Sequence, residues 1–419
     1  MKKWYFVFCS LVLFQSALIT SAYGDSAEVL PKGISNINIS GTYYFNIDER
    51  YGPDGDTEDV DADFNATLDS GVFSDLGALE SFFGMPAGSA NIGDSVVNYD
   101  YDFSKIEISF MYGLTDNLTV GVRLPYWWIK NNVNAQLDTT NATIGKSATG
   151  VLFGAPLVPL AANPFGDALP LTTEDVYDLV GSGLDVNGDS VIDIPGYGYK
   201  RISSFSDNGI GDSEIGGRYQ YLKNEKWQLA VTGGLRLPTG RIDDPNDLMD
   251  YGISDGAYAL FLHANNDYTG FDKLVLNGTA RYYAYLPDEE TLRITFSADE
   301  PITPNMEEVE RDLGDVLELE LSGKYSFSNE WSCFGLYKYG HKWKDHISGD
   351  MGYNYDGLED ETDYEEHVYF IGLTYSTIQM YTEKKFPIPL AASISYRDRF
   401  KGENLFKSKY IEAAVRLFF

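Results

Sequence analysis

Charged side chains recur at every second position within several apolar runs of this sequence. Lys105 and Glu107 flank Ile106, and Arg236 separates two leucines. The charged residues that share the face opposite the apolar one are Lys105, Glu107, Arg123, Glu214, Arg218, Arg236, Arg281, Glu318, Glu320, Lys324, Arg397, Glu412 and Arg416. Such a set could line a water-filled pore with a charged constriction. Alternatively, the charges could pair and brace a closed interior, because isolated buried charges are costly.

An acidic loop at residues 185–193 is a second chemical signal. Oxygen-bearing side chains stand at its first, third, fifth and ninth positions, as in calcium loops: Asp185, Asn187, Asp189 and Asp193. Ser190 replaces the usual glycine, and Gly196 stands where a bidentate glutamate belongs. The loop is therefore either a calcium site or an ordinary Asx-rich turn, and no other cofactor is expected.

Catalysis has less support in the sequence. The histidines are His263, His341, His346 and His367, and no serine motif accompanies them. A membrane phospholipase needs a serine and a histidine adjacent on its lipid face, so we expect a protein that is not an enzyme. A metal cluster of the last three histidines with Glu365 and Glu366 is the remaining alternative.

The elements that must position these side chains are predicted to be β-strands. In residues 209–240, two runs alternate strictly between apolar and polar residues around a short polar turn. Each run has about the ten residues that a tilted strand needs to cross a bilayer. The pattern recurs from residues 36–47 to residues 411–419 and gives twelve strands. Trp127 and Trp128 end one of them, where an aromatic belt would lie.

The connections between these strands alternate in length. Brief connections follow the even-numbered strands, and mostly long ones follow the odd-numbered strands. Bacterial barrels have an even number of strands, short periplasmic turns and long outer loops. The sequence therefore predicts an all-β fold, a transmembrane up-and-down antiparallel β-barrel of about 12 strands with long extracellular loops.

The start of the chain has the features of a signal peptide. Lys2 and Lys3 precede an apolar core, and Ala22-Tyr23-Gly24 fits the small-x-small cleavage rule. We expect export through the Sec pathway, with residues 1–24 as signal peptide and residues 25–419 as the barrel. Long insertions are expected at about 48–98, 129–208, 287–312 and 345–363. They include an apolar piece at 151–164 and a helix at 173–180.

The first long insertion also carries apolar residues at helical spacing, before Gly84. They are Phe73, Leu76, Leu79, Phe82 and Phe83. They could form a lid at the mouth of the barrel, which would suit an apolar solute. The alternative is a loop helix packed on its neighbours.

The formal net charge of −32 at pH 7 bounds the partners of the chain. Such acidity excludes nucleic acid as a partner on electrostatic grounds. The acidic runs are instead expected in solvated loops, where divalent cations could bridge them to lipopolysaccharide.

Two stretches resemble known proteins. The last strand, with Ile411, Ala413, Val415, Leu417 and Phe419 on one face, resembles the C-terminal signature of Gram-negative outer-membrane proteins. This resemblance implies the bacterial outer membrane and recognition of Phe419 by the barrel-assembly machinery. Gly209-Ile210-Gly211-Asp212, then Gly217-Arg218-Tyr219, then Leu237-Pro238-Thr239-Gly240, resembles the outer-membrane family named for the meta-pathway of phenol degradation.

The second resemblance implies a barrel that admits aromatic or other hydrophobic compounds. The expected function is an outer-membrane channel for passive uptake of small molecules, with hydrophobic and aromatic ones as candidate solutes. The alternatives are a general porin, a surface-loop or structural barrel without transport, and a phospholipase-type enzyme.

Overall fold

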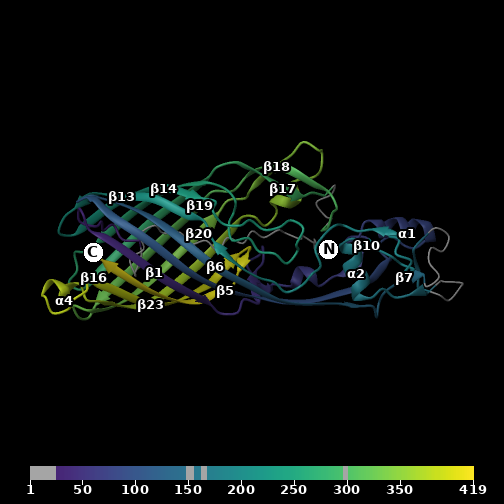
Figure 1. The fold of residues 1–419 in the computed structure, drawn as a ribbon, viewed down its shortest axis with the longest axis horizontal. Coiled ribbons are helices and arrows are strands. Elements are labelled where there is room, and N and C mark those ends of the chain that lie inside the picture. The colour runs from purple at the N-terminus through teal and green to yellow at the C-terminus, as the bar shows by residue number, and fades with distance from the viewer. Residues whose placement is uncertain (1–24, 148–154, 162–167, 296–300) are drawn as a thin grey trace.

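The computed structural model of the chain describes residues 25–147, 155–161, 168–295 and 301–419. Its main body is a closed antiparallel barrel, from one end of which a smaller body of loops projects (Figure 1). The barrel strands are β1 (Ser35–Tyr44), β5 (Asn91–Thr115), β6 (Leu118–Asp138), β13 (Ser213–Lys223), β14 (Trp227–Leu237), β15 (Ala259–Tyr268), β16 (Leu274–Tyr285), β19 (Val316–Ser326), β20 (Trp331–Lys342), β22 (Tyr364–Ser376), β23 (Leu390–Glu403) and β25 (Lys409–Phe418). The first strand pairs with both β5 and β25, which closes the barrel.

Period-two alternation produces the two faces of the wall. In β1, Ile39 is 46% exposed, whereas Asn38 and Ser40 are 8% and 6% exposed. Leu319 in β19 is likewise exposed on the outer face, between the buried Glu318 and Glu320. Apolar side chains on the outer face and polar ones inside are the pattern of a barrel that spans a lipid bilayer. The predicted fold is confirmed.

Aromatic side chains gather on the outer face near both ends of the barrel. Trp227 packs on Tyr268, and Trp331 on Tyr375, beside the short turns. Trp128 is exposed at the other end of the wall. Such girdles mark the two membrane–water interfaces. Trp127, by contrast, is only 3% exposed and faces inward, so its assignment to the belt was wrong.

One hairpin is much longer than the sequence predicts. The pairing of β5 with β6 extends to Asp94 and Asp138, beyond the rim of the barrel. Residues 91–98 and 129–138 therefore continue the two strands, although they were predicted as loop. The reason is packing, because Val97, Tyr99 and Tyr101 on the extension are buried against the loops.

The loops fold into small sheets and short helices. Three-stranded sheets are formed by β2 (Glu49–Tyr51), β3 (Thr57–Asp59) and β24 (Leu405–Phe406), by β7 (Ile144–Ser147), β8 (Leu157–Pro159) and β9 (Ala168–Leu169), and by β17 (Asp288–Arg293), β18 (Met306–Asp312) and β21 (His346–Ser348). The other loop elements are η1 (Ala62–Phe64), β4 (Thr67–Asp69), α1 (Asp75–Phe83), α2 (Thr173–Val180), β10 (Gly183–Leu184), β11 (Ile194–Pro195), β12 (Ser206–Ile210), α3 (Asp356–Glu359) and α4 (Ile378–Thr382).

The predicted helix at residues 173–180 is α2. Thr172 caps it in a reciprocal capping box with Asp175, which satisfies two backbone N–H groups at its first turn. Among the residues that the structure describes, no helix is long and apolar enough to span a membrane. The predicted signal peptide, and residues 151–154 and 162–164 of the predicted apolar piece, lie outside the described residues.

Candidate lumenal site

The first described residues of the chain lie inside the barrel. From the start of β1, residues 25–32 run back into the lumen along its wall. The backbone N–H of Lys32 donates to Asp116 in the turn between β5 and β6, and that of Leu30 donates to Thr119. Further along, Ala27 N–H and Ser26 Oγ both bind Asp267 of β15. This N-terminal segment therefore fills part of the lumen from the short-turn end.

Asp25, at the tip of the segment, is fully buried near the middle of the strands. Its carboxylate pairs with Arg218 of β13, and Arg281 Nε lies 3.3 Å from Oδ2. His263 Nδ1 is 3.0 Å from the same Oδ2. The backbone N–H of Asp25 donates to Glu320 Oε1 at 3.1 Å. Four barrel strands thus converge on this one residue.

A chain of ion pairs runs along the lumenal wall formed by the neighbouring strands β5, β6, β13 and β14. Arg123 bridges two carboxylates, with Nη1 2.9 Å from Glu107 Oε2 and Nη2 2.6 Å from Glu214 Oε1. Lys105 lies 3.3 Å from Glu107, and Arg236 lies 3.1 Å from Glu214. Glu214 has no exposed surface, and both of these arginines pair with its carboxylate.

A second chain of ion pairs joins β16, β19, β20, β22 and β23. Glu318 is 3.2 Å from Arg281 and 2.9 Å from Lys338. Lys338 also pairs with Glu366, which accepts two hydrogen bonds of 2.9 Å from Arg399. We call the two chains together, with Asp25, the lumenal ion-pair network. Its members alternate in sign, so most of the charge is compensated within hydrogen-bond distance.

A cluster of buried aromatic side chains lies above this network, at the end of the barrel that carries the long loops. We call it the aromatic rim cluster; its members are Tyr44, Tyr51, Tyr99, Tyr101, Phe103, Trp127, Tyr251, Phe406 and Tyr410. Tyr101 stacks on Phe103, with ring centroids 5.4 Å apart and an interplanar angle of 12°. Phe406 and Tyr251 come from loops and contact the same two rings. The cluster therefore couples the loops to the barrel wall.

The structure places every charged residue predicted for the inner face on that face. Ten of them are less than 9% exposed, namely Lys105, Glu107, Arg123, Glu214, Arg218, Arg236, Arg281, Glu318, Glu320 and Arg397. Lys324, Glu412 and Arg416 are half-buried. Arg397 lies over the ring of Phe370 at 4.2 Å, and Thr42 Oγ1 donates to Glu412. These positions show burial and pairing; that they border a solute path is a separate proposal.

Several lumenal residues were missed by the sequence-based prediction. Asp25, Lys338, Glu366 and Arg399 belong to the network, and His263 was considered only as a catalytic residue. Lys338 faces inward from β20 beside Ser332, Phe334 and Leu336, and the two apolar residues on that face hid the alternation. Asp25 has no periodic signal. The sequence marked it only as the residue after the predicted cleavage point.

The helix considered as a lid lies in the loop body, at the far end from the barrel (Figure 1). Phe73 and Leu76 are each 3% exposed and pack with Ile144, Leu157 and Leu179, while Leu79 packs on the edge of this cluster. Phe83 is half-buried, and Phe82 is 62% exposed. The structure therefore has the packed helix rather than the lid, because the neighbouring loops supply the apolar partners.

The acidic loop at residues 185–193 makes the hydrogen bonds of Asx turns. Asp185 accepts from the N–H groups of Gly188 and Ser190, and Asn187 accepts from Asp189 N–H. Asp189 and Asp193 accept from Val191 and Val186. Within the described ranges, no three His, Cys, Asp or Glu side chains are grouped so as to hold a metal ion. The bonds are those of the Asx-turn alternative.

The histidines do not form a joint site. His263 is fully buried in the lumen, between Asp25 and Tyr283, so it is not on the lipid face that a phospholipase requires. His346 binds Glu359 in a loop, whereas His367 binds Glu365 and Tyr337 at the barrel wall. Glu366 points into the lumen instead, because neighbouring residues of a strand face opposite sides.

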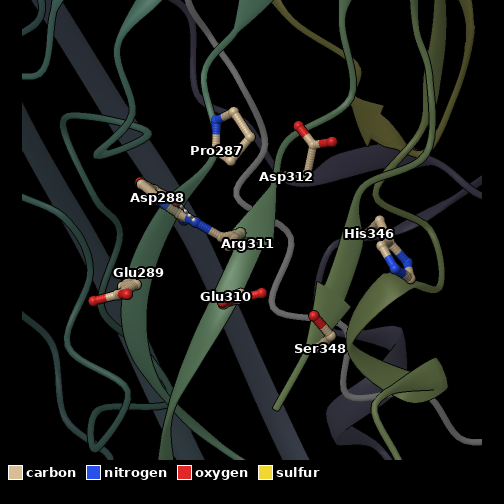
Figure 2. A pocket seen from close by; sticks show the side chains of 8 residues that line it. All are labelled: Pro287, Asp288, Glu289, Glu310, Arg311, Asp312, His346 and Ser348. Carbon is tan, nitrogen blue, oxygen red and sulfur yellow. Dashed lines mark hydrogen bonds and ion pairs between the residues drawn. The ribbon is translucent and has the colours of Figure 1, made fainter.

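A polar hollow of about 750 Å³ lies on the loop sheet of β17, β18 and β21 (Figure 2). Arg311 is its central cation, and its Nη2 lies 2.7 Å from both Asp288 Oδ2 and the Asp255 carbonyl oxygen. Nη1 pairs with Glu290, whose pKa is raised to about 7 by burial. Nε donates to Asp288 Oδ1 at 3.0 Å. All three guanidinium nitrogens thus already have partners, so the hollow is a weaker candidate site than the lumen.

Comparison with solved structures found several proteins of bacterial outer membranes. An outer membrane channel from Pseudomonas putida F1 matches 94% of this chain and 98% of its own, with a TM-score of 0.52 and 12% identity. A FadL homologue from Pseudomonas aeruginosa covers 93% and 90% of the two chains, with a TM-score of 0.33 and 10% identity. The toluene transporter TbuX from Ralstonia pickettii covers 93% and 90%, with a TM-score of 0.36 and 8% identity.

No protein-family model and no curated protein matches this sequence. The similarity to the Pseudomonas putida channel establishes a shared barrel fold. Together with the apolar outer face and its aromatic girdles, it makes this chain a β-barrel of the Gram-negative outer membrane.

Proposed function

We propose that the chain is an outer-membrane channel for passive uptake of small molecules, and that hydrophobic or aromatic compounds are among its solutes. The observation that carries the proposal is the aromatic rim cluster. Its rings lie on the inner side of the strands at the long-loop end of the barrel, packed against the loops, where a solute from outside would enter. Stacked and edge-on aromatic contacts favour flat apolar solutes. The fold shared with a bacterial outer membrane channel supports the same function.

The route below the rim would run through the lumenal ion-pair network. The charged residues predicted from the sequence, from Lys105 to Arg416, would border it. Because these charges are paired in the structure, the network resembles a closed state of the passage. The N-terminal segment is the part of the lumen that belongs to no strand, so its departure would widen the lumen without breaking the wall.

The sequence resemblance to the family named for the meta-pathway of phenol degradation supports aromatic solutes. A general porin is the second candidate, but it is disfavoured by the close pairing of the charges along the lumenal wall. A structural barrel that only displays loops is the third. It is favoured by those same pairs and by the packed loop body, so conduction itself must be measured.

The test uses the purified full chain in planar bilayers and in liposomes loaded by diffusion. We expect discrete current steps that toluene or phenol reduces, and uptake of these solutes into liposomes. The matched variants are Phe406→Ala, inside the rim, and Phe400→Ala, on the outer face, where Phe400 is 50% exposed. The first should weaken the aromatic effect and the second should not. Absence of both current steps and uptake would contradict transport.

Two partners follow from the location. We propose that the assembly machinery reads the last strand, whose Phe419 is 65% exposed and exchanges two backbone hydrogen bonds with Ser35. We also propose that the acidic loops face lipopolysaccharide across bound divalent cations. Deletion of Phe419 should lower the amount of barrel in the membrane fraction, as judged by its heat-sensitive mobility on gels.

A further inference from the structure

Two independent observations meet at Asp25. The sequence pattern at Ala22-Tyr23-Gly24 puts the cleavage point directly before it. The structure puts its backbone nitrogen inside the lumen, 3.1 Å from Glu320 Oε1, in a residue without exposed surface. Cleavage at this point would therefore create a chain terminus that is already in contact with a buried carboxylate.

The side-chain carboxylate and the carbonyl oxygen of Asp25 also have ion-pair or hydrogen-bond partners in the barrel wall. Its side-chain carboxylate faces Arg218, Arg281 and His263. Its carbonyl oxygen accepts hydrogen bonds from Asn265 Nδ2 at 2.9 Å, Thr279 Oγ1 at 3.0 Å and Asn277 Nδ2 at 3.3 Å. A pocket with an acceptor at the nitrogen, cations at the carboxylate and neutral donors at the carbonyl is specific for one residue in one orientation.

The barrel wall is acidic beside the backbone nitrogen of Asp25, where cleavage would create a positively charged α-ammonium group. Glu320 is half-compensated by Arg281, whose Nη2 is 2.9 Å from Oε2, and this leaves Oε1 for the nitrogen of Asp25. Asp267, 1% exposed, faces Ser26 and Ala27 one step further along the segment. An ammonium group donates stronger hydrogen bonds to a carboxylate than a peptide N–H does.

We propose that this pocket is a binding site for the processed N-terminus of the chain itself. A peptidase of the export pathway adds water across the Gly24–Asp25 peptide bond, and the C–N bond breaks. Gly24 leaves with a carboxylate, and the nitrogen of Asp25 takes up a proton and becomes an ammonium. This ammonium then pairs with Glu320, and the Asp25 side chain pairs with the two arginines, so that maturation fixes the segment in the lumen. The inference does not rest on transport.

The first test is made on the mature protein purified from outer membranes. Intact mass and N-terminal sequencing should show a chain that begins at Asp25. An amine-reactive ester at neutral pH should label the α-amino group of the folded barrel at least about tenfold more slowly than that of the heat-unfolded chain, because labelling requires local opening. A mature chain that begins elsewhere, or equal labelling rates, would overturn the proposal.

The second test separates the pocket from the rest of the network. Glu320→Gln removes the partner of the ammonium and should speed labelling of the folded protein several-fold. Glu318→Gln is the matched control, because Glu318 pairs with Arg281 and Lys338 rather than with Asp25. Equal labelling in the two folded variants would show that Glu320 does not hold the terminus. If either variant fails to fold, the measurement on the unaltered chain still decides the proposal.

Discussion

The aromatic rim cluster and the lumenal ion-pair network occupy the same barrel at different heights and are built by different rules. The rim joins strands β1, β5, β6 and β25 to aromatic side chains from three loops. Such contacts tolerate shifts, because the hydrophobic effect is not directional. The network joins nearly all its members by ion pairs with fixed partners, and a charge that loses its partner inside the barrel is costly. The difference suggests that the rim can rearrange around a solute, whereas the network holds the shape of the barrel.

The largest expected effect comes from Glu214→Gln. This change leaves Arg123 and Arg236 buried beside a neutral amide, and breaking a buried ion pair costs about 3–5 kcal/mol. We expect a large fall in the temperature at which the barrel loses its compact mobility on gels, measured in one detergent. Glu225→Gln in the exposed turn between β13 and β14 is the control and should change nothing. If both variants melt alike, the network does not hold the barrel together.

A smaller effect is expected from Phe406→Ala at the rim. Removal of a buried phenylalanine costs about 3 kcal/mol or more. Here the lost stability should affect the loops rather than the whole barrel, because Phe406 joins the loops to Tyr101 and Phe103. We expect faster hydrogen exchange in β2 and β24 while the melting temperature of the barrel changes little. If Phe406→Ala lowered the melting temperature of the barrel as much as Glu214→Gln does, the distinction between the rim and the network would be lost.

The sequence predicted the barrel because most strands alternate between apolar residues that face lipid and polar residues that face the lumen. Ile106 and Leu319 are exposed, and Lys105 and Glu318 are buried, as the period of two requires. Strand β20 shows where this fails. Phe334 and Leu336 face inward while Trp331 and Tyr337 face outward, so both of its faces are apolar and alternation could not assign them.

The rest of the site was not predictable because it is made by residues distant in sequence. Tyr251 and Phe406 reach the rim from separate loops, and the order of the chain does not show that they meet Phe103. The extension of β5 and β6 was missed for the same reason, since its polar residues look like loop until its partners are known. Asp25 precedes the first strand, and no periodic pattern covers it.

The third prediction concerns Glu361, a loop residue whose titration should make the anchoring of β2 depend on pH. Glu361→Gln should remove this dependence. Burial raises the pKa of Glu361 to about 7, and the neighbouring Asp63 and Glu58 raise it too, while Arg50 lowers it. The folded carboxyl therefore keeps its proton at pH values where an unfolded one loses it. Between about pH 4.5 and pH 7 the unfolded carboxyl is charged while the folded one stays protonated, so anchoring of β2 should weaken as pH rises through this window.

The measurement is hydrogen exchange of residues 49–59, with each rate divided by the intrinsic rate at its pH. The unaltered chain should lose protection between about pH 4.5 and pH 7, and Glu361→Gln should flatten the profile, because glutamine does not titrate. Glu289→Gln in β17 serves as the control. The same pH profile in all three proteins would assign the pH dependence to other groups. Barrel strands should show little of this change in any of them.

The smallest effect is expected from Arg201→Ala. This change breaks a solvent-exposed ion pair, whereas the ion pairs of the lumenal network are buried. Arg201 donates to both oxygens of Glu174 at 2.5 and 2.6 Å and lies over the ring of Tyr177, yet both charged side chains are more than half exposed. Exposed pairs contribute little to stability, and salt screens them. We therefore expect slightly faster exchange in α2, a smaller difference from the unaltered chain at high salt, and no change in barrel melting. Arg201→Lys keeps the charge but not the paired hydrogen bonds, so its exchange rate in α2 should lie between those of the unaltered chain and Arg201→Ala. A loss comparable to that of Glu214→Gln would show that burial is not what separates the lumenal pairs from those of the loops.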